Sequence, residues 1–211
     1  MLKKILSLCL LTVCILSAKL SDAEKMVALH HLNPAIKIQC MYATYDNFTG
    51  QPLYPVQFYN KAYLLKEVAE QIHLIQKELE QLGLGLLIWD AFRPLQGQQQ
   101  LWNACPDDRF VAPPSKGGRH TRGTTIDLTL IDLKTGNPLD MGTGFDVFID
   151  RSASDCTTLS EIALANRKLL QDIMKKYGFT VLKSEWWHFD YENVFDYPVL
   201  DVSFEELALI R

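Results

Sequence analysis

Apolar residues in the middle of the chain recur at a helical period. Between residues 60 and 82 they fall every three or four positions, as one buried face of a helix requires. These positions are Leu64, Val68, Ile72, Ile75, Leu79 and Leu82. Asn60 is a residue type that caps a helix N-terminus, and Gly83 is a type that ends one. We therefore predict a long amphipathic helix from Asn60 to Gln81.

Two further helices are predicted from the signals at their ends. Pro94 suits the first turn of a helix, which we expect to run through Trp102. Thr158 and Glu161 have the spacing of a capping box, and we expect the helix behind it to continue to Tyr177. Helices are thus predicted at three separate places along the chain.

Shorter apolar runs, bounded by glycine, proline or polar residues, predict strands. They span Ile36–Tyr42, Leu84–Trp89, Ile126–Leu133, Phe179–Leu182 and Trp186–Tyr191. Because most of these strands come late in the chain, after helices, the pattern favours the α+β class. We expect a single domain with a mainly antiparallel sheet and flanking helices.

Composition is consistent with this single domain. A chain of 211 residues that is 48% hydrophobic can build one sizeable core, and no internal repeat or low-complexity linker divides it. The formal net charge of -4 and the absence of a basic run argue against a nucleic-acid partner.

The first 23 residues have the layout of a secretory signal peptide. Met1–Lys4 is positively charged, Ile5–Leu16 is almost wholly apolar, and small residues lead to Ala23. The apolar run is too short to span a membrane comfortably. A buried helix is the alternative, but the lysines at the front favour a signal. We expect residues 1–23 to be a signal peptide, export to the periplasm or beyond, and no stable membrane anchor.

The cysteines leave the disulfide pattern open. Cys40, Cys105 and Cys156 remain in the mature chain, residues 24–211, if a signal peptide is removed. In an oxidising compartment they could form one disulfide and leave one free thiol. None of them belongs to a CxxC pair, so ligation of a metal by cysteine is not expected.

Two short segments carry the residue types of a catalytic zinc site. His120 and Asp127 lie seven residues apart across a glycine, and Glu185 precedes His188 by three residues. Two imidazoles and one carboxylate make a three-ligand set that leaves the fourth position of zinc open. Glu185 is then a spare carboxylate, close enough in sequence to His188 to act as a base beside the metal.

Each of these residues also has a structural interpretation. Asp127 lies in an apolar strand, where a carboxylate needs a partner, and that partner could be Arg119 or Arg122. His188 could be a core histidine bonded to a backbone carbonyl, and Glu185 an exposed residue at a strand edge. The presence of both segments in one chain favours the metal site.

These segments resemble a known signature. His120-x-x-Gly123-x-Thr125-x-Asp127, followed by Glu185-x-x-His188, is similar to the HxxGxAxD…ExxH pattern of metallopeptidases that include D-alanyl-D-alanine carboxypeptidases, lysostaphin-type enzymes and the hedgehog fold. Within that group the chain resembles the D-alanyl-D-alanine dipeptidases of the VanX type. Six blocks in the same order carry the resemblance: Tyr42–Gly50, Trp89–Pro94, Ile126–Leu130, Gly144–Asp146, Glu185–His188 and Phe195–Pro198.

The resemblance implies a role for each site residue. Glu185 would take a proton from water at the metal and deliver it to the leaving amine, and Arg93 would stabilise the oxyanion. Asp146 would pair with the substrate ammonium, and Tyr42 would line the same pocket. The alternatives are an ion pair between Arg93 and Asp90, and a turn position for Asp146.

Two positions depart from the family pattern. Gly118 stands where family members commonly have a serine, which is expected to help hold the substrate amino end. Thr125 stands where a small alanine is usual, and its hydroxyl could donate a hydrogen bond to a group behind a metal ligand. The metal site looks intact, whereas the substrate pocket differs.

The resemblance implies a zinc metallopeptidase that hydrolyses the small peptide D-alanyl-D-alanine, with a hedgehog-like or D-Ala-D-Ala peptidase-like fold. One alternative is a D,D-carboxypeptidase that trims peptidoglycan stem peptides. The other is a catalytically silent cell-wall-binding domain with a structural zinc ion. A structural zinc site would have a fourth protein ligand, for which the sequence offers no good candidate.

Overall fold

In the computed structural model, residues 21–108 and 111–210 are described. The predicted signal peptide, residues 1–23, therefore lies outside the described residues except for its last three. The helices are α1 (Leu29–Leu32), α2 (Lys66–Glu80), α3 (Leu95–Ala104), α4 (Glu161–Lys176) and α5 (Phe204–Leu207). The strands are β1 (Met26–Ala28), β2 (Lys37–Ile38), β3 (Tyr63–Leu65), β4 (Leu84–Asp90), β5 (Thr125–Asp132), β6 (Phe179–Leu182) and β7 (Glu185–Tyr191).

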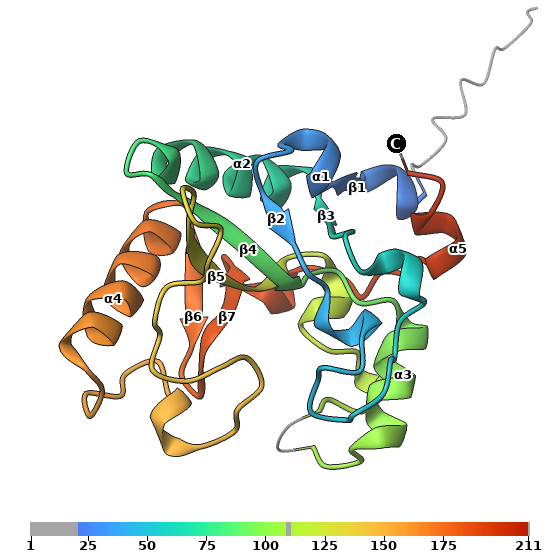
Figure 1. Ribbon diagram of the computed structural model, residues 1–211. Coiled ribbons are helices and arrows are strands. Elements are labelled where there is room, and N and C mark those ends of the chain that lie inside the picture. Colours follow the sequence, from blue (N-terminus) through green and yellow to red (C-terminus); the bar gives the residue numbers. More distant parts are fainter. Residues whose placement is uncertain (1–20, 109–110, 211) are drawn as a thin grey trace, which may run out of the picture.

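A central five-stranded sheet has the order β2-β4-β5-β7-β6 (Figure 1). β2 runs parallel to β4, and the β4–β5, β5–β7 and β6–β7 pairs are antiparallel. A separate pair is formed by β1 and β3. The predicted α+β domain with a mainly antiparallel sheet is confirmed.

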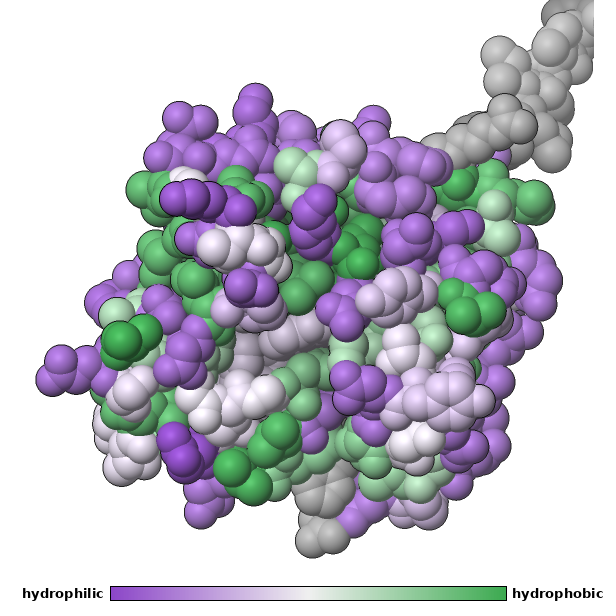
Figure 2. Space-filling model, in the orientation of Figure 1, coloured by the Kyte–Doolittle hydropathy of each residue, from purple (hydrophilic) through white to green (hydrophobic). Residues whose placement is uncertain are grey.

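Two amphipathic helices pack on the sheet. α2 contacts β4, and α4 contacts β6 and β5 (Figure 1). Figure 2 shows hydrophilic side chains gathered over the outer surface of α2 at the top of the view. Four positions of the predicted apolar face are buried in α2: Val68, Ile72, Ile75 and Leu79. Ala69 and Gln76 are buried beside them.

The predicted start of the long helix is wrong. The helix begins at Lys66, and Asn60 does not cap it. The three residues before it are all buried and form β3, which pairs with β1 from the start of the described chain. A short apolar run such as Tyr63–Leu65 fits the period of a helix and that of a strand equally well. Pairing with β1, which lies far away in the sequence, makes it a strand.

Two other boundaries differ from their predictions. The cap of α4 is Ser160, whose Oγ accepts a hydrogen bond from the Ala163 backbone at 3.1 Å, so Thr158 is not the capping residue. The strand predicted at Ile36–Tyr42 is only two residues long, and a 3-10 helix at Met41–Ala43 follows it. That turn buries Tyr42 instead of leaving it in a sheet.

The described chain contains neither a disulfide nor a membrane-spanning helix. Cys40, Cys105 and Cys156 are free, so the possible disulfide among them is not formed. Of the helices that the structure describes, none has the length and apolar character needed to cross a membrane.

Candidate active site

The register of β5 and β7 brings two predicted metal ligands together. Asp127 lies directly opposite His188, and Thr125 lies directly opposite Asp190. Because side chains two residues apart on a strand point to the same face, these four side chains share one face of the sheet. Their alternate neighbour on β5, Ile126, points to the other face and is fully buried.

A short 3-10 helix at His120–Arg122 places the third ligand. Gly123 ends it with a φ of 71°, a left-handed conformation that favours glycine. A β-carbon at Gly123 would also lie 3.4 Å from the backbone nitrogen of Leu65, which donates a hydrogen bond to the Gly123 carbonyl. The backbone nitrogen of Arg93 donates to the carbonyl of His120, which fixes the turn against the end of β4.

The three residues offer a compact set of ligand atoms. His120 Nε2 lies 3.3 Å from His188 Nδ1 and 3.3 Å from Asp127 Oδ2. His188 Nδ1 lies 3.0 Å from Asp127 Oδ1. One ligand atom from each residue can be chosen so that all lie within 4.8 Å of one another, and all three side chains are buried. Nitrogen and oxygen donors in this arrangement suit zinc.

The remaining polar atoms of these residues support the same assignment. His120 Nδ1 lies 2.8 Å from the carbonyl oxygen of Ala91, which leaves Nε2 for a metal. His188 Nε2 lies 3.3 Å from Asp190 Oδ1, which leaves Nδ1. Within the described residues, Asp127 Oδ1 is buried without a hydrogen bond of good geometry. A buried oxygen of this kind needs a partner, and a cation between the three side chains supplies one.

Asp190 is a functional candidate to which sequence reasoning assigned no role. Besides its contact with His188, Asp190 accepts a hydrogen bond from Thr125 Oγ1 at 2.7 Å and forms an ion pair with Arg119. Arg119 therefore pairs with Asp190, and the alternative in which Arg119 is the partner of Asp127 is wrong. The expected hydrogen bond from Thr125 to a group behind a ligand is present. Together these contacts orient the His188 ring.

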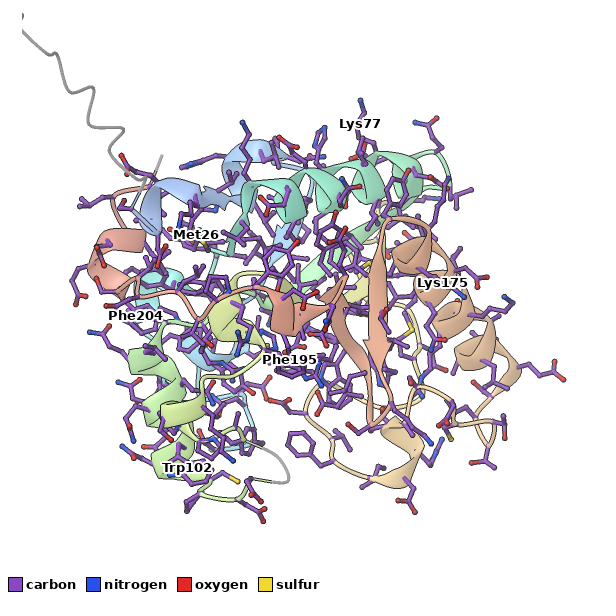
Figure 3. The ribbon with its side chains drawn as sticks, turned by 180° about the vertical axis from the view of Figure 1, so that it is seen from behind. Met26, Lys77, Trp102, Lys175, Phe195 and Phe204 are labelled. Carbon is purple, nitrogen blue, oxygen red and sulfur yellow. The ribbon has the colours of Figure 1, made fainter. Side chains whose placement is uncertain are left out.

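Arg119 and Arg122 lie on the same aromatic ring. Phe195, labelled in Figure 3, lies near the centre of the molecule seen from behind, and the guanidinium carbons are 4.9 and 5.5 Å from the centre of its ring. Arg122 also donates to the carbonyl of Tyr197. These contacts hold the segment around residues 194–198 against the turn that carries His120.

The electrostatics of the metal-free cluster pair a cation with an anion. Burial works to lower the pKa of His188, but the nearby carboxylates of Asp127, Asp190 and Glu185 outweigh it and raise this pKa from 6.5 to about 10. Burial works to raise the pKa of Asp127, but His120 and His188 hold it well below its usual value. At neutral pH a protonated His188 thus occupies the place of the positive charge that a metal would bring.

Zinc binding should therefore release a proton from His188. We expect the zinc association constant to rise about tenfold per pH unit between pH 7.5 and 9, because His188 must lose its proton to ligate. In the metal-free protein the raised pKa stabilises the fold below pH 6.5, and this contribution disappears as the pH rises towards about 10. Competition with a chelator of known zinc affinity measures the slope.

A matched variant tests the cause of this pH dependence. Asp190→Asn weakens one of the hydrogen bonds that raise the pKa of His188, so the zinc association constant should stop rising with pH at a lower pH than in the unaltered protein. A pH-independent zinc affinity in the unaltered protein would contradict the proposed ligation by His188.

Glu185 begins β7 beside the ligand cluster. Its Oε2 lies 3.6 Å from His188 Nδ1, and its side chain is 19% exposed. Burial is the main cause that raises the pKa of Glu185, opposed by His188. A carboxyl group with a raised pKa, beside the candidate metal ligands and partly open to solvent, is suited to exchange protons. The exposed strand-edge position is therefore not what the structure shows.

Arg93 makes the ion pair with Asp90 and also lies in the site. Its Nη2 is 2.8 Å from Asp90 Oδ2, and its guanidinium carbon is 5.2 Å from the centre of the Tyr42 ring. Tyr54 accepts from Arg93 Nε at 3.1 Å and lies 3.1 Å from Asp90 Oδ1. The pairing with Asp90 thus fixes the guanidinium in place instead of removing it from the pocket.

Asp146 and Tyr42 meet across 104 residues of sequence. Tyr42 donates its hydroxyl hydrogen to Asp146 Oδ2 at 2.7 Å. Asp146 has a φ of 54°, so the turn position expected as an alternative is also real, but its carboxylate points at Tyr42. Burial and the nearby charge of Asp127 raise the pKa of Asp146 well above its usual value.

One pocket contains all seven predicted site residues. It has a volume of about 360 Å³, near the lower end of the range for small-molecule sites. The predicted residues that line it are Tyr42, Arg93, His120, Asp127, Asp146, Glu185 and His188. Gly118 and Gln98 form part of its wall, and sequence reasoning did not single out Gln98. Phe48 and Phe148 also line the pocket, and their rings meet edge to face with their centres 5.4 Å apart.

Comparison with known proteins agrees with this geometry. A family model described as D-ala-D-ala dipeptidase matches residues 22–204. A D-alanyl-D-alanine dipeptidase of Escherichia coli (strain K12) is 40% identical over 189 residues, which are 88% of this chain and 94% of that relative. A D-alanyl-D-alanine dipeptidase of Enterococcus faecalis is 33% identical over 187 aligned positions, and the match covers 80% of this chain and 91% of that relative.

A solved structure described as VanYB in complex with D-Alanine-D-Alanine is a distant likeness, with a TM-score of 0.43 at 11% identity over 65% of this chain and 76% of that chain. The family match covers most of the sequence, and the relatives are matched over almost their whole length. This chain therefore belongs to the D-ala-D-ala dipeptidase family and is a metallopeptidase.

Proposed function

We propose that this protein is a zinc-dependent dipeptidase that hydrolyses D-alanyl-D-alanine to free D-alanine. The observation that carries the proposal is that one pocket joins the His120, Asp127 and His188 cluster to the Tyr42–Asp146 pair. The names of the relatives support the dipeptide as substrate. The signal-like sequence of residues 1–23 supports export. In the periplasm or outside the cell, the activity would recycle the dipeptide of the cell wall.

His120 Nε2, His188 Nδ1 and an oxygen of Asp127 would hold the zinc ion. When bound, zinc acts as a Lewis acid and lowers the pKa of water to about 7. Glu185 takes a proton from the attacking water and then delivers it to the nitrogen of the leaving D-alanine. The raised pKa of Glu185 suits this second step, because a weaker acid retains the proton until the amine needs it.

Arg93 stabilises the negative charge that develops on the carbonyl oxygen of the scissile bond. Its buried guanidinium is held by Asp90, Tyr54 and Gln98 before any substrate arrives. A donor held in this way needs no reorganisation during the reaction, which is the condition for effective oxyanion stabilisation.

Asp146 binds the free amino end of the substrate. Four carboxylates line the pocket, those of Asp108, Asp127, Asp146 and Glu185. Burial and the charges of Asp127 and Glu185 raise the pKa of Asp146. A substrate ammonium supplies a positive charge that offsets this repulsion. Phe48 and Phe148, whose rings meet edge to face, form part of the wall of the same pocket, and its volume of about 360 Å³ suits a dipeptide better than a stem peptide.

Replacing Asp146 should weaken the binding of the free dipeptide specifically. We expect Asp146→Asn to raise KM for D-Ala-D-Ala about 10- to 100-fold, because a charge-assisted hydrogen bond contributes roughly 1.5–3 kcal/mol. N-acetyl-D-Ala-D-Ala, which lacks the ammonium, is the matched substrate. If both substrates lose the same activity, Asp146 is not the amino-end receptor.

Metal removal tests the function itself. The protein stripped with a chelator should release no D-alanine from D-Ala-D-Ala, and added zinc should restore the release. Magnesium should not replace zinc, because it prefers oxygen ligands to imidazole. D-Alanine release that persists in the stripped protein would overturn the zinc-dependent mechanism.

A further inference from the structure

The pocket wall at Gly118 is filled by a side chain from α3. A β-carbon built on Gly118 would lie 3.0 Å from Gln98 Oε1 and 3.4 Å from Gln98 Cδ. Gly118 has no left-handed φ, so its backbone accepts other residues and the space beside it is what limits the position. The glycine that departs from the family pattern is thus matched to the glutamine packed against it.

Gln98 is almost fully buried and has two hydrogen bonds. Its Oε1 accepts from Arg93 Nη1 at 3.1 Å, and its Nε2 donates to the carbonyl of Ala112 at 2.7 Å. Arginine can only donate and a carbonyl can only accept, so these partners determine which end of the amide carries the oxygen. Gln98 therefore connects Arg93 to the loop that precedes the metal-binding turn.

The contacts of Arg93 explain why this connection matters. A guanidinium has five N–H groups. In the described part of the chain, Nε bonds to Tyr54 and Asp90, Nη2 to Asp90, and Nη1 to Gln98. One N–H on each nitrogen is thus engaged, which leaves two for a substrate. Asp90 holds one side of the group, and Gln98 supplies the acceptor at Nη1.

We infer that Gln98 is a positioning residue, which aims the free N–H groups of Arg93 at the scissile carbonyl and needs Gly118 as its neighbour. The inference rests on the proposed function for its kinetic consequence. Gln98 acts through Arg93 and does not touch the reacting atoms, so its loss should affect the transition state more than substrate binding. The amide of Gln98 thus forms the part of the pocket wall that lies beside Gly118, two residues before His120.

Three single variants separate this role from a structural one. Gln98→Met keeps the volume but removes the acceptor, and should lower kcat for D-Ala-D-Ala about tenfold, the value of one lost hydrogen bond, with little change in KM. Gln98→Glu keeps an acceptor for Arg93 but loses the donor to Ala112, and should retain most of kcat. Gln99→Met is the matched control, because Gln99 is exposed on the same helix and bonds only to Asn103 among the described contacts.

Equal losses in Gln98→Met and Gln98→Glu would overturn the inference, because they would assign the role to the loop contact with Ala112. A rise in KM without a fall in kcat would also overturn it. A normal kcat in Gln98→Met would show that Arg93 needs no support from Gln98.

A double-mutant cycle measured by melting temperature tests the packing of Gln98 against Gly118 and needs no activity assay. Gly118→Ala should lower the melting temperature, because its new methyl group displaces the amide of Gln98. The same change in a Gln98→Ala background should have a smaller effect. Additive effects would overturn the packing relation. If the unaltered protein fails to cleave D-Ala-D-Ala, the proposed function fails, while this cycle still decides whether the two residues are coupled.

Discussion

Glu185→Gln should lower kcat for D-Ala-D-Ala by about 10²- to 10⁴-fold, the range for loss of a general acid–base group. The amide has the size of the carboxylate but cannot take a proton from water or return it to the leaving amine. Zinc content and KM should stay close to those of the unaltered protein, since Glu185 is not a ligand in the proposed site. D-Alanine release and zinc analysis on the same sample measure both.

Glu192→Gln is the control for this change. Glu192 follows the same strand, is exposed, and does not line the pocket. It should leave kcat unchanged. If Glu185→Gln retains kcat within about threefold, far less than loss of acid–base catalysis costs, Glu185 does not move protons in the rate-limiting step. If it instead loses zinc, Glu185 belongs to the metal ligands.

Arg93→Lys should lower kcat by about 10²- to 10³-fold, the loss seen when one oxyanion donor is removed. Lysine keeps the charge near Asp90 but lacks the planar fork that lets Arg93 bond to Asp90 and Gln98 and still present free N–H groups. The expected loss is therefore in kcat, measured by D-alanine release at saturating dipeptide.

The choice of lysine separates catalysis from folding. Arg93→Met would leave Asp90 buried without its cation, and breaking a buried pair costs about 3–5 kcal/mol of stability. Arg167→Lys is a matched control, because Arg167 is buried against backbone carbonyls away from the pocket. An Arg93→Lys variant with normal kcat would contradict the oxyanion role.

The candidate metal cluster was predictable because each part lies in a short local motif. Asp127 lies in one strand and His188 in another, so a single strand pairing brings these two together, and the 3-10 turn just before β5 adds His120. Gly123 could be recognised in the same way, since the left-handed turn behind His120 favours glycine. Patterns with a fixed spacing are preserved when the chain folds.

The residues that support the site were not predictable from spacing. Asp190 lies 65 residues from Thr125 and 71 from Arg119, its partners in the fold. Gln98 lies within a helix whose polar residues are mostly exposed, but it is buried, with Gly118 packed beside it and hydrogen bonds to Arg93 and Ala112. These contacts depend on tertiary packing that no local pattern records.

The misplaced helix start has a related cause. Residues 63–65 fit the helical period of the segment behind them, but pairing with β1 makes them a strand. Local propensity is a weak preference that tertiary contacts override. The helix itself and the middle of its predicted buried face, Val68, Ile72, Ile75 and Leu79, agree with the prediction, because they depend on a long periodic segment rather than on one terminal residue. Leu82, predicted to continue that face, lies beyond the helix and is exposed.

D-Alanine release by the zinc-loaded protein from D-Ala-D-Ala, compared with release from a cell-wall pentapeptide ending in the same pair, tests the central claim most directly. The Tyr42–Asp146 pair and the small volume of the pocket predict cleavage of the free dipeptide and little or none of the pentapeptide. Efficient cleavage of the pentapeptide would contradict this and identify a D,D-carboxypeptidase. Silence on both substrates would contradict the dipeptidase and favour a cell-wall-binding zinc domain.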